Sequence, residues 1–103
     1  MAGHKSGVIW SPEALADIDR LWTYYARTAG PATADKLLRE VGRMVATIDD
    51  FPLAGRSRAE IRAGLRSLAA SPQIVFYRLK DDRPEIVRVL DGRQDIEEIF
   101  SEG

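Results

Sequence analysis

The sequence predicts an α+β domain of two layers, in which a helical hairpin packs on a mainly antiparallel sheet. Two amphipathic helical segments come first, with one short break between them, and three β-rich segments follow, separated by short turns. Short connections between neighbouring helices or strands favour antiparallel pairs. With a leading strand and a short final helix, the expected order is β-α-α-β-β-β-α, and residues 1–103 are expected to form a single domain.

The first strand is predicted at residues 7–10, a short apolar run that ends at the start of a helix. Ser11 suits the N-cap of that helix, and Pro12 suits its first position. We expect Asp17 to lie mostly off the apolar face of the helix. The residues that form this face by helical spacing are Ala14, Leu15, Ile18, Leu21, Trp22 and Tyr25.

A second helix is predicted from Pro31 to about Asp50, because Gly30-Pro31 breaks the first helix and Phe51-Pro52 ends the second. The apolar stripe of this helix consists of Ala34, Leu37, Leu38, Val41, Met44, Val45 and Ile48. Residues 51–60 are rich in Pro, Gly and Arg, which indicates a loop.

The last part of the chain predicts three strands and a short helix. The strands are expected at residues 61–70, 73–79 and 85–90. Ser71-Pro72 and residues 80–84 supply the turns between them. Gly92 suits a tight turn out of the third strand, and Asp95 suits the cap of a helix that runs to Phe100.

Composition excludes several kinds of site. There is no cysteine, and His4 is the only histidine, so we expect no metal site, no disulfide and no cofactor. The absence of cysteine makes a reducing cytoplasm the expected compartment, and no apolar run reaches membrane-spanning length. The net charge is −1, from 15 basic and 16 acidic residues, so no strong direct binding to nucleic acid is expected.

Arginines set among the apolar residues of the predicted strands are the main functional signal. A guanidinium is rarely tolerated near a core without an anionic partner. The arginines concerned are Arg66, Arg78, Arg88 and Arg93. They could form an anion-binding surface for a phosphate backbone or for the carboxylates of an acidic peptide. Alternatively, each could pair within the chain with Asp91, Asp95 or Glu85.

The register of the last two strands can be estimated from the predicted turn at residues 80–84. A symmetric turn places Arg78 opposite Ile86. It also places Arg88 opposite Phe76, and strand alternation then puts all four side chains on one face of the sheet. We therefore expect two guanidiniums to stand close together there.

Seven short motifs follow one another along the chain. They are Trp10-Ser11-Pro12 with Ala14 and Asp17-Ile18, Phe51-Pro52 with Gly55-Arg56, Gly64-Leu65-Arg66, Ile74 to Arg78, Ile86 to Leu90, Gly92-Arg93 and Asp95. In this order they resemble the ParE branch of the ParE/RelE superfamily of bacterial toxins, from about Val8 to Phe100.

The resemblance implies a toxin of a type II toxin–antitoxin pair. Toxins similar to ParE act on DNA gyrase, whereas toxins similar to RelE are ribosome-dependent mRNA endonucleases. The implied partners are DNA gyrase and a ParD-like antitoxin, which we expect to fill an apolar groove between the helical hairpin and the sheet. The candidate residues for binding antitoxin or target are Arg66, Arg78, Arg88, Arg93 and Asp91.

One departure from the family pattern bears on the choice between these activities. Many relatives carry His where this chain has Asp91, and an unperturbed carboxylate is a poor proton donor near neutral pH. The chain therefore favours inhibition of gyrase by binding, with no catalytic residues of its own. The alternative is an mRNA endonuclease of RelE type that uses Arg66, Arg88 and Asp91. A third interpretation is an interaction module without toxicity.

Overall fold

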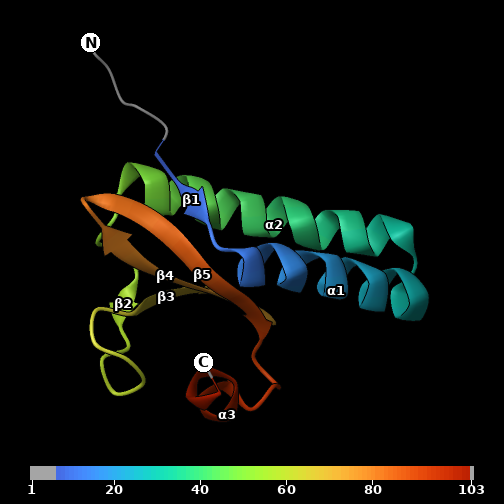
Figure 1. Ribbon diagram of the computed structural model, residues 1–103. Coiled ribbons are helices and arrows are strands. Elements are labelled where there is room, and N and C mark those ends of the chain that lie inside the picture. Colours follow the sequence, from blue (N-terminus) through green and yellow to red (C-terminus); the bar gives the residue numbers. More distant parts are fainter. Residues whose placement is uncertain (1–6, 103) are drawn as a thin grey trace.

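The computed structural model describes residues 7–102, and it has the predicted order of elements with one additional strand (Figure 1). The elements are β1 (Ile9–Trp10), α1 (Pro12–Ala29), α2 (Pro31–Asp50), β2 (Arg56–Ser57), β3 (Arg66–Ala70), β4 (Gln73–Lys80), β5 (Arg83–Asp91) and α3 (Ile96–Ser101). The additional strand is β2, which lies in the segment predicted as a loop.

The five strands form one sheet in the order β1-β5-β4-β3-β2. β1 pairs with β5 in parallel, and the other pairs are antiparallel. The hairpin of α1 and α2 covers one face of this sheet, and α3 lies on the opposite side (Figure 1). The predicted α+β class is confirmed, with its helical hairpin, mainly antiparallel sheet and short final helix.

The start of α1 is bound to the edge of the sheet through Ser11. Its hydroxyl accepts a hydrogen bond from the Ala14 N–H at 3.0 Å, as expected of an N-cap. The same hydroxyl donates to the Val87 carbonyl at 2.8 Å, and the Ser11 N–H donates to the Ile86 carbonyl at 3.0 Å. α1 therefore begins where the pairing between β1 and β5 ends.

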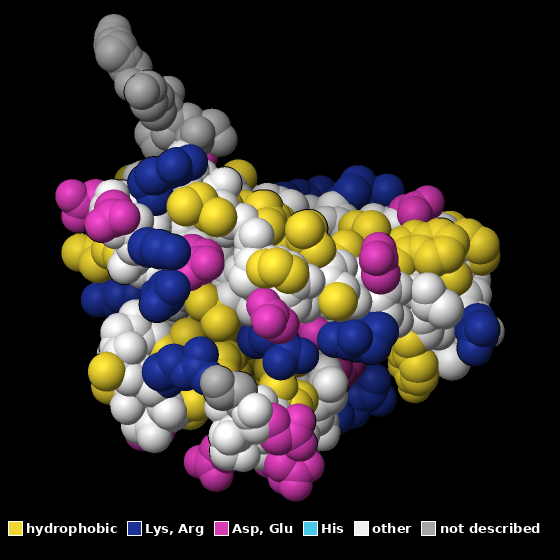
Figure 2. Space-filling model, in the orientation of Figure 1, with side chains coloured by type: hydrophobic (Ala, Val, Ile, Leu, Met, Phe, Trp, Pro, Cys, Tyr) yellow, Lys and Arg dark blue, Asp and Glu magenta, His cyan; other side chains and the backbone are white. Residues whose placement is uncertain are grey.

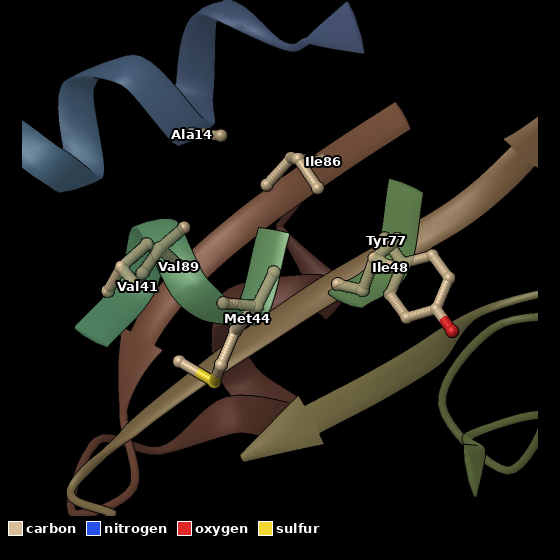
Figure 3. Close-up of a cluster of buried hydrophobic side chains, with 8 residues drawn as sticks. Ala14, Val41, Met44, Ile48, Tyr77, Ile86 and Val89 are labelled. Carbon is tan, nitrogen blue, oxygen red and sulfur yellow. The ribbon is translucent and has the colours of Figure 1, made fainter. Parts of the chain in front are cut away.

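The main core lies between the helical hairpin and the sheet (Figure 3). Its buried members are Ala14, Val41, Met44, Ile48, Val75, Tyr77, Ile86 and Val89. The helical spacing predicted the four members from α1 and α2 correctly. The prediction was wrong for Leu15, a residue that is 54% exposed.

A second, smaller core lies on the other face of the sheet. There Phe100 of α3 packs edge-on against Phe76, with ring centroids 5.0 Å apart, and Leu65 and Leu90 complete the buried cluster. Asp95 caps α3 as predicted, accepting from the Glu98 N–H at 3.2 Å. The sequence predicted two layers, which would leave the second face of the sheet exposed. α3 covers part of that face, so the face is less exposed than predicted.

The turn between β4 and β5 is shorter than predicted. Lys80 pairs with Arg83, so the turn consists only of Asp81 and Asp82. Both have positive φ, 54° and 64°, as in the turns that suit two-residue hairpin loops. Asn-Gly is the usual sequence there, and an Asp-Asp pair gives a weaker signal.

This short turn shifts the register near the hairpin by one residue. Arg78 lies opposite Glu85, and the prediction that it faces Ile86 was wrong. A β-bulge next to Phe76 then inserts one residue on β5, which restores the predicted pairing of Phe76 with Arg88. The bulge also breaks the alternation, so Ile86 packs on the hairpin side, away from Phe76.

The loop between α2 and β2 is held against the sheet at Gly55. The Tyr77 hydroxyl accepts from the Gly55 N–H and donates to the Pro52 carbonyl, both at 2.8 Å. A Cβ at position 55 would lie 2.6 Å from the Tyr77 ring and 2.8 Å from the Ser67 carbonyl oxygen. Only glycine fits at this approach.

We predict that Gly55→Ala lowers the free energy of unfolding by about 2–3 kcal/mol, because the added methyl group displaces a buried tyrosine and a strand carbonyl. Gly42→Ala is the matched control. A Cβ at Gly42, inside α2, meets nothing within 4 Å, so this change should raise stability by about 0.5–1 kcal/mol. Urea titrations of both variants measure the difference, and equal effects would contradict the packing argument.

Candidate functional site

A buried carboxylate, Asp17, joins α1 to the edge of β5. Its side chain is 2% exposed and receives two hydrogen bonds from Arg88, Nε to Oδ2 at 2.8 Å and Nη2 to Oδ1 at 2.9 Å. The Val89 N–H donates to Oδ2 at 2.9 Å, and Arg20 Nη2 donates to Oδ1 at 2.6 Å. The pairing with Asp17 raises the pKa of Arg88.

The prediction that Asp17 lies off the apolar face was wrong. Helical spacing contained the relevant signal, because Asp17 is three residues after Ala14 and four before Leu21, and all three therefore share one face of α1. A carboxylate at such a position requires a cationic or N–H partner. β5 supplies both kinds of partner, the Arg88 guanidinium and the Val89 N–H.

A second network surrounds Asp91 at the end of β5. Arg93 donates to its carboxylate from Nε and Nη2, each at 3.0 Å, and from its backbone N–H at 2.9 Å. The Tyr25 hydroxyl of α1 donates to Oδ2 at 2.7 Å and accepts from Arg93 Nη2 at 3.1 Å. Gln94 closes the turn, with its side-chain oxygen 2.7 Å from the Asp91 nitrogen.

These contacts set the ionisation of the group. Hydrogen bonds from the Arg93 side chain, opposed by burial and aided by the Arg93 N–H and Tyr25, lower the pKa of Asp91 from 3.8 to about 2. Burial and the bond to Asp91 raise the pKa of Tyr25. Asp91 is therefore a carboxylate, and Tyr25 a neutral hydroxyl, throughout the neutral pH range.

The remaining two candidate arginines have different partners. Arg78 donates from Nε to Glu85 at 2.6 Å, and about half of its side chain is exposed. Arg66 Nη1 donates to the Gly55 carbonyl at 2.7 Å, so it helps to hold the loop after α2. Of the internal pairs expected from the sequence, those of Arg78 with Glu85 and Arg93 with Asp91 are present.

Arg78 and Arg88 line neighbouring depressions on the α3 side of the sheet. These depressions share Glu13, Arg62 and Val87. Arg62 lies over the Phe100 ring, 5.1 Å from its centroid, and donates to the Phe100 carbonyl at 3.2 Å. Arg78 and Arg88, which were expected on one face of the sheet, therefore do line adjoining depressions. Each of them is paired with a carboxylate of the chain.

A separate cavity of about 290 Å³ opens between α1 and the connection from β5 to α3. We call it the α1–β5 pocket. It is lined by Asp17, Arg20, Leu21, Tyr24, Val89, Asp91, Arg93 and Gln94. Cationic side chains gather in the region between α1 and α3 (Figure 2). Both buried carboxylate networks therefore border the same pocket, which the sequence did not indicate.

Within residues 7–102 no group of three or more His, Cys, Asp or Glu side chains is placed to hold a metal ion. None of the helices in this part of the chain has the length and apolarity to cross a membrane. His4, the only histidine of the sequence, lies outside the described residues.

The sequence matches a known protein family. Residues 8–96 match the family model described as the ParE toxin of the type II toxin–antitoxin system, parDE. The chain belongs to this family. The ParE membership expected from the motifs is confirmed.

Several relatives are similar over most of their length. Toxin ParE3 of Caulobacter vibrioides is 32% identical over 89 residues, 86% of this chain and 89% of the relative. Toxin ParE1 of the same organism is 38% identical over 80 residues, which cover 78% of this chain and 82% of the relative. Toxin ParE1 of Mycobacterium tuberculosis is 32% identical over 94 residues, which cover 90% of this chain and 96% of the relative.

A solved structure has the same fold. It is titled as the chromosomal ParDE TA system from P. aeruginosa and superposes with a TM-score of 0.74 at 24% identity. The match covers 86% of this chain and 98% of that chain. At this identity the likeness establishes the fold alone.

We predict that Asp17→Asn destabilises the fold by about 2–4 kcal/mol, because it leaves the half-buried Arg88 guanidinium without its charged partner. Asp19→Asn is the control, since Asp19 is an exposed carboxylate of the same helix. Its effect should stay within about 0.5 kcal/mol. Chemical denaturation of both variants at neutral pH measures the difference, and a small effect of Asp17→Asn would refute its structural role.

A second prediction concerns pH. The folded-state pKa of Asp91 is about 2, below its ordinary 3.8, so its stabilising contribution is present above pH 4 and is lost as the pH falls toward 2. Asp91→Asn removes this dependence. The stability advantage of the parent protein over Asp91→Asn should shrink by about 1–2 kcal/mol between pH 6 and pH 2. Denaturation curves across this range test it, and a constant difference would contradict it.

Proposed function

We propose that this ParE-family protein inhibits DNA gyrase by binding to it, and that a ParD-like antitoxin neutralises it. Membership of the ParE toxin family supports the class of protein. The choice of a binding mechanism over a chemical one comes from the state of Asp91.

In the endonuclease alternative, Asp91 would have to transfer the protons, since it stands where many relatives are expected to carry His. A general acid must carry a proton near neutral pH, and a general base must have a pKa close enough to that pH to accept one. With a pKa of about 2 and its oxygens engaged by Arg93 and Tyr25, Asp91 meets neither requirement. This observation carries the proposal.

The geometry gives a second argument against the endonuclease alternative. Arg66 lies opposite Tyr77 on β4, whereas Asp91 lies opposite Gln73. Four residues of extended strand separate these positions, which is roughly 13 Å along the sheet. Arg88 in turn is held by Asp17. The three residues of the alternative are not assembled around one reacting phosphate.

Inhibition by binding needs a firm surface with accessible anchoring groups. Arg78 and Arg93 expose about half or more of their side chains, and each is oriented by a carboxylate. Arg66 holds the loop after α2, and Arg88 holds α1 to β5. We keep all four arginines, with Asp91, as the candidate contact set, and we expect Arg78 and Arg93 to contribute most.

The decisive experiment is a supercoiling assay with purified gyrase and relaxed plasmid DNA. The protein should abolish supercoiling, and linear cleaved DNA should accumulate. Arg78→Gln should raise the half-inhibitory concentration about tenfold, the loss expected when one charged contact is removed from an interface. Arg43→Gln is the matched control, because Arg43 is an exposed arginine of α2 that also pairs with a glutamate, Glu40.

Unaffected gyrase together with toxicity in cells would reject this proposal. Cleavage of mRNA on ribosomes would then be examined with Asp91→Asn, and a strong loss of cleavage in that variant would establish the endonuclease alternative. Harmless expression of the protein alone would favour an interaction module.

A further inference from the structure

Gln73, at the start of β4, carries a buried amide that has no hydrogen-bond partner in residues 7–102. The residue is 2% exposed, and solvent reaches neither the nitrogen nor the oxygen of its side chain. An unpaired buried amide costs folding free energy, and such groups are normally bonded in proteins. Because this amide is closed to solvent, any partner for it has to come from the protein itself.

The amide lies beside the network around Asp91. Gln73 pairs directly with Asp91 in the ladder between β4 and β5, so the two side chains share one face of the sheet, with Cβ atoms about 5 Å apart. Burial and the bond to Asp91 raise the pKa of Tyr25, and the Gln73 amide opposes this rise. An amide that favours the phenolate presents its N–H to the phenol oxygen. Gln73 therefore faces the Tyr25 hydroxyl, although no hydrogen bond joins them.

The Tyr25 oxygen already has another donor. It accepts from Arg93 Nη2 at 3.1 Å and gives its own proton to Asp91 Oδ2 at 2.7 Å. Gln73 and Arg93 are therefore two donors directed at one oxygen, and only Arg93 is bonded to it. Arg93 exposes 69% of its side chain, whereas Gln73 is buried. The donor that is bonded is thus the one that is free to turn away.

Asp91 does not depend on the Arg93 guanidinium for all of its hydrogen bonds. Its Oδ1 also accepts from the backbone N–H of Arg93 at 2.9 Å, and its Oδ2 accepts from Tyr25. Each carboxylate oxygen therefore keeps one donor when the guanidinium turns away. The atom that loses a bond without such a replacement is the Tyr25 oxygen, and this is the atom that Gln73 faces.

We propose that Gln73 replaces Arg93 as the donor to Tyr25 when the Arg93 guanidinium leaves Asp91 for an anionic group of a binding partner. Gln73 is then a positioning residue, which keeps Tyr25 and Asp91 in place while the arginine is used outside the chain. The exchange of donors requires this chain alone. That a partner draws the arginine away rests on the proposed function, in which Arg93 belongs to the contact set.

This exchange lowers the free-energy cost of releasing Arg93. Before release, the Gln73 amide carries the penalty of an unpaired buried group. After release it gains a hydrogen bond, and this gain offsets part of what the bonds of Arg93 contributed. Arg20 offers a comparison, because it borders the same pocket but bonds to Asp17, which belongs to the other network.

The first test is NMR spectroscopy of the isotope-labelled protein and its variants. Arg93→Ala removes the guanidinium and keeps the backbone N–H that Asp91 accepts. In this variant the side-chain N–H signals of Gln73 should move downfield, because the amide becomes hydrogen-bonded. Arg20→Ala is the matched control, since Arg20 is a similarly exposed arginine on a buried aspartate, and it should leave these signals in place. Adding Tyr25→Phe to Arg93→Ala should abolish the downfield shift.

Urea denaturation tests the same exchange through Gln73→Met, which keeps the length of the side chain without its polar atoms. In the parent protein this change should leave the unfolding midpoint unchanged or raise it, because an unpaired amide is removed. In Arg93→Ala it should instead reduce the folding equilibrium constant about tenfold, since a buried hydrogen bond is lost. In Arg20→Ala its effect should match that in the parent.

The supercoiling assay provides a readout in function. Gln73→Met should weaken the inhibition of gyrase about threefold, because the release of Arg93 no longer gains a hydrogen bond. A purely structural role of Gln73 would not combine a stable fold with weaker inhibition.

Three results would overturn the inference. They are Gln73 signals that stay in place in Arg93→Ala, an equal stability effect of Gln73→Met in the parent and in Arg93→Ala, and inhibition of gyrase that Gln73→Met leaves unchanged. Gyrase that the parent protein does not inhibit removes only the gyrase proposal, because the NMR and denaturation measurements need no partner. Inhibited gyrase with unmoved Gln73 signals removes only the donor exchange.

Discussion

The carboxylate of Asp17 is the interaction on which much of this structure depends. β5 is paired with β1 over only two residues, so most of its outer edge needs partners from elsewhere. Ser11 and Asp17, both from the start of α1, supply them. A single buried side chain thereby fixes the position of α1 on the sheet, satisfies a strand N–H, and balances Arg88. Removing it would leave an unpaired charge and an unpaired backbone group at the same place.

This arrangement changes how the arginines should be understood. They are not a set of free cations on one sheet face, since every one of the four candidates has a partner in the described part of the chain. Some partners are structural in effect, as when Arg66 holds the loop at Gly55. Others orient a guanidinium that still faces solvent, as Asp91 does for Arg93. The same ion pair can therefore have two effects. Its buried carboxylate stabilises the fold, and the exposed part of its arginine is held ready to bind a partner.

How much of this could be predicted from the sequence depends on the range of the interactions involved. Local patterns gave both helices of the hairpin, the Ser11 and Asp95 caps and the last two long strands, because spacing and capping are properties of neighbouring residues. The two-residue turn at Asp81-Asp82 and the bulge beside Phe76 were missed, since each depends on how two strands fit together. The α1–β5 pocket was missed for the same reason. It is formed where Asp17 and Tyr25 of one helix meet the end of β5, about 70 residues later in the chain.

The outer strands of the sheet, β1 and β2, have two residues each. A long flat edge exposes a row of unpaired N–H and C=O groups, which can template the addition of strands from another molecule. On the β5 side of this sheet few such groups remain, because β1 pairs with part of β5 and Ser11 and Asp17 bond to backbone groups further along it. Two copies that met at this edge would form few ladder hydrogen bonds. This edge of the sheet is thus protected against the uncontrolled addition of strands by its own architecture, before any partner binds.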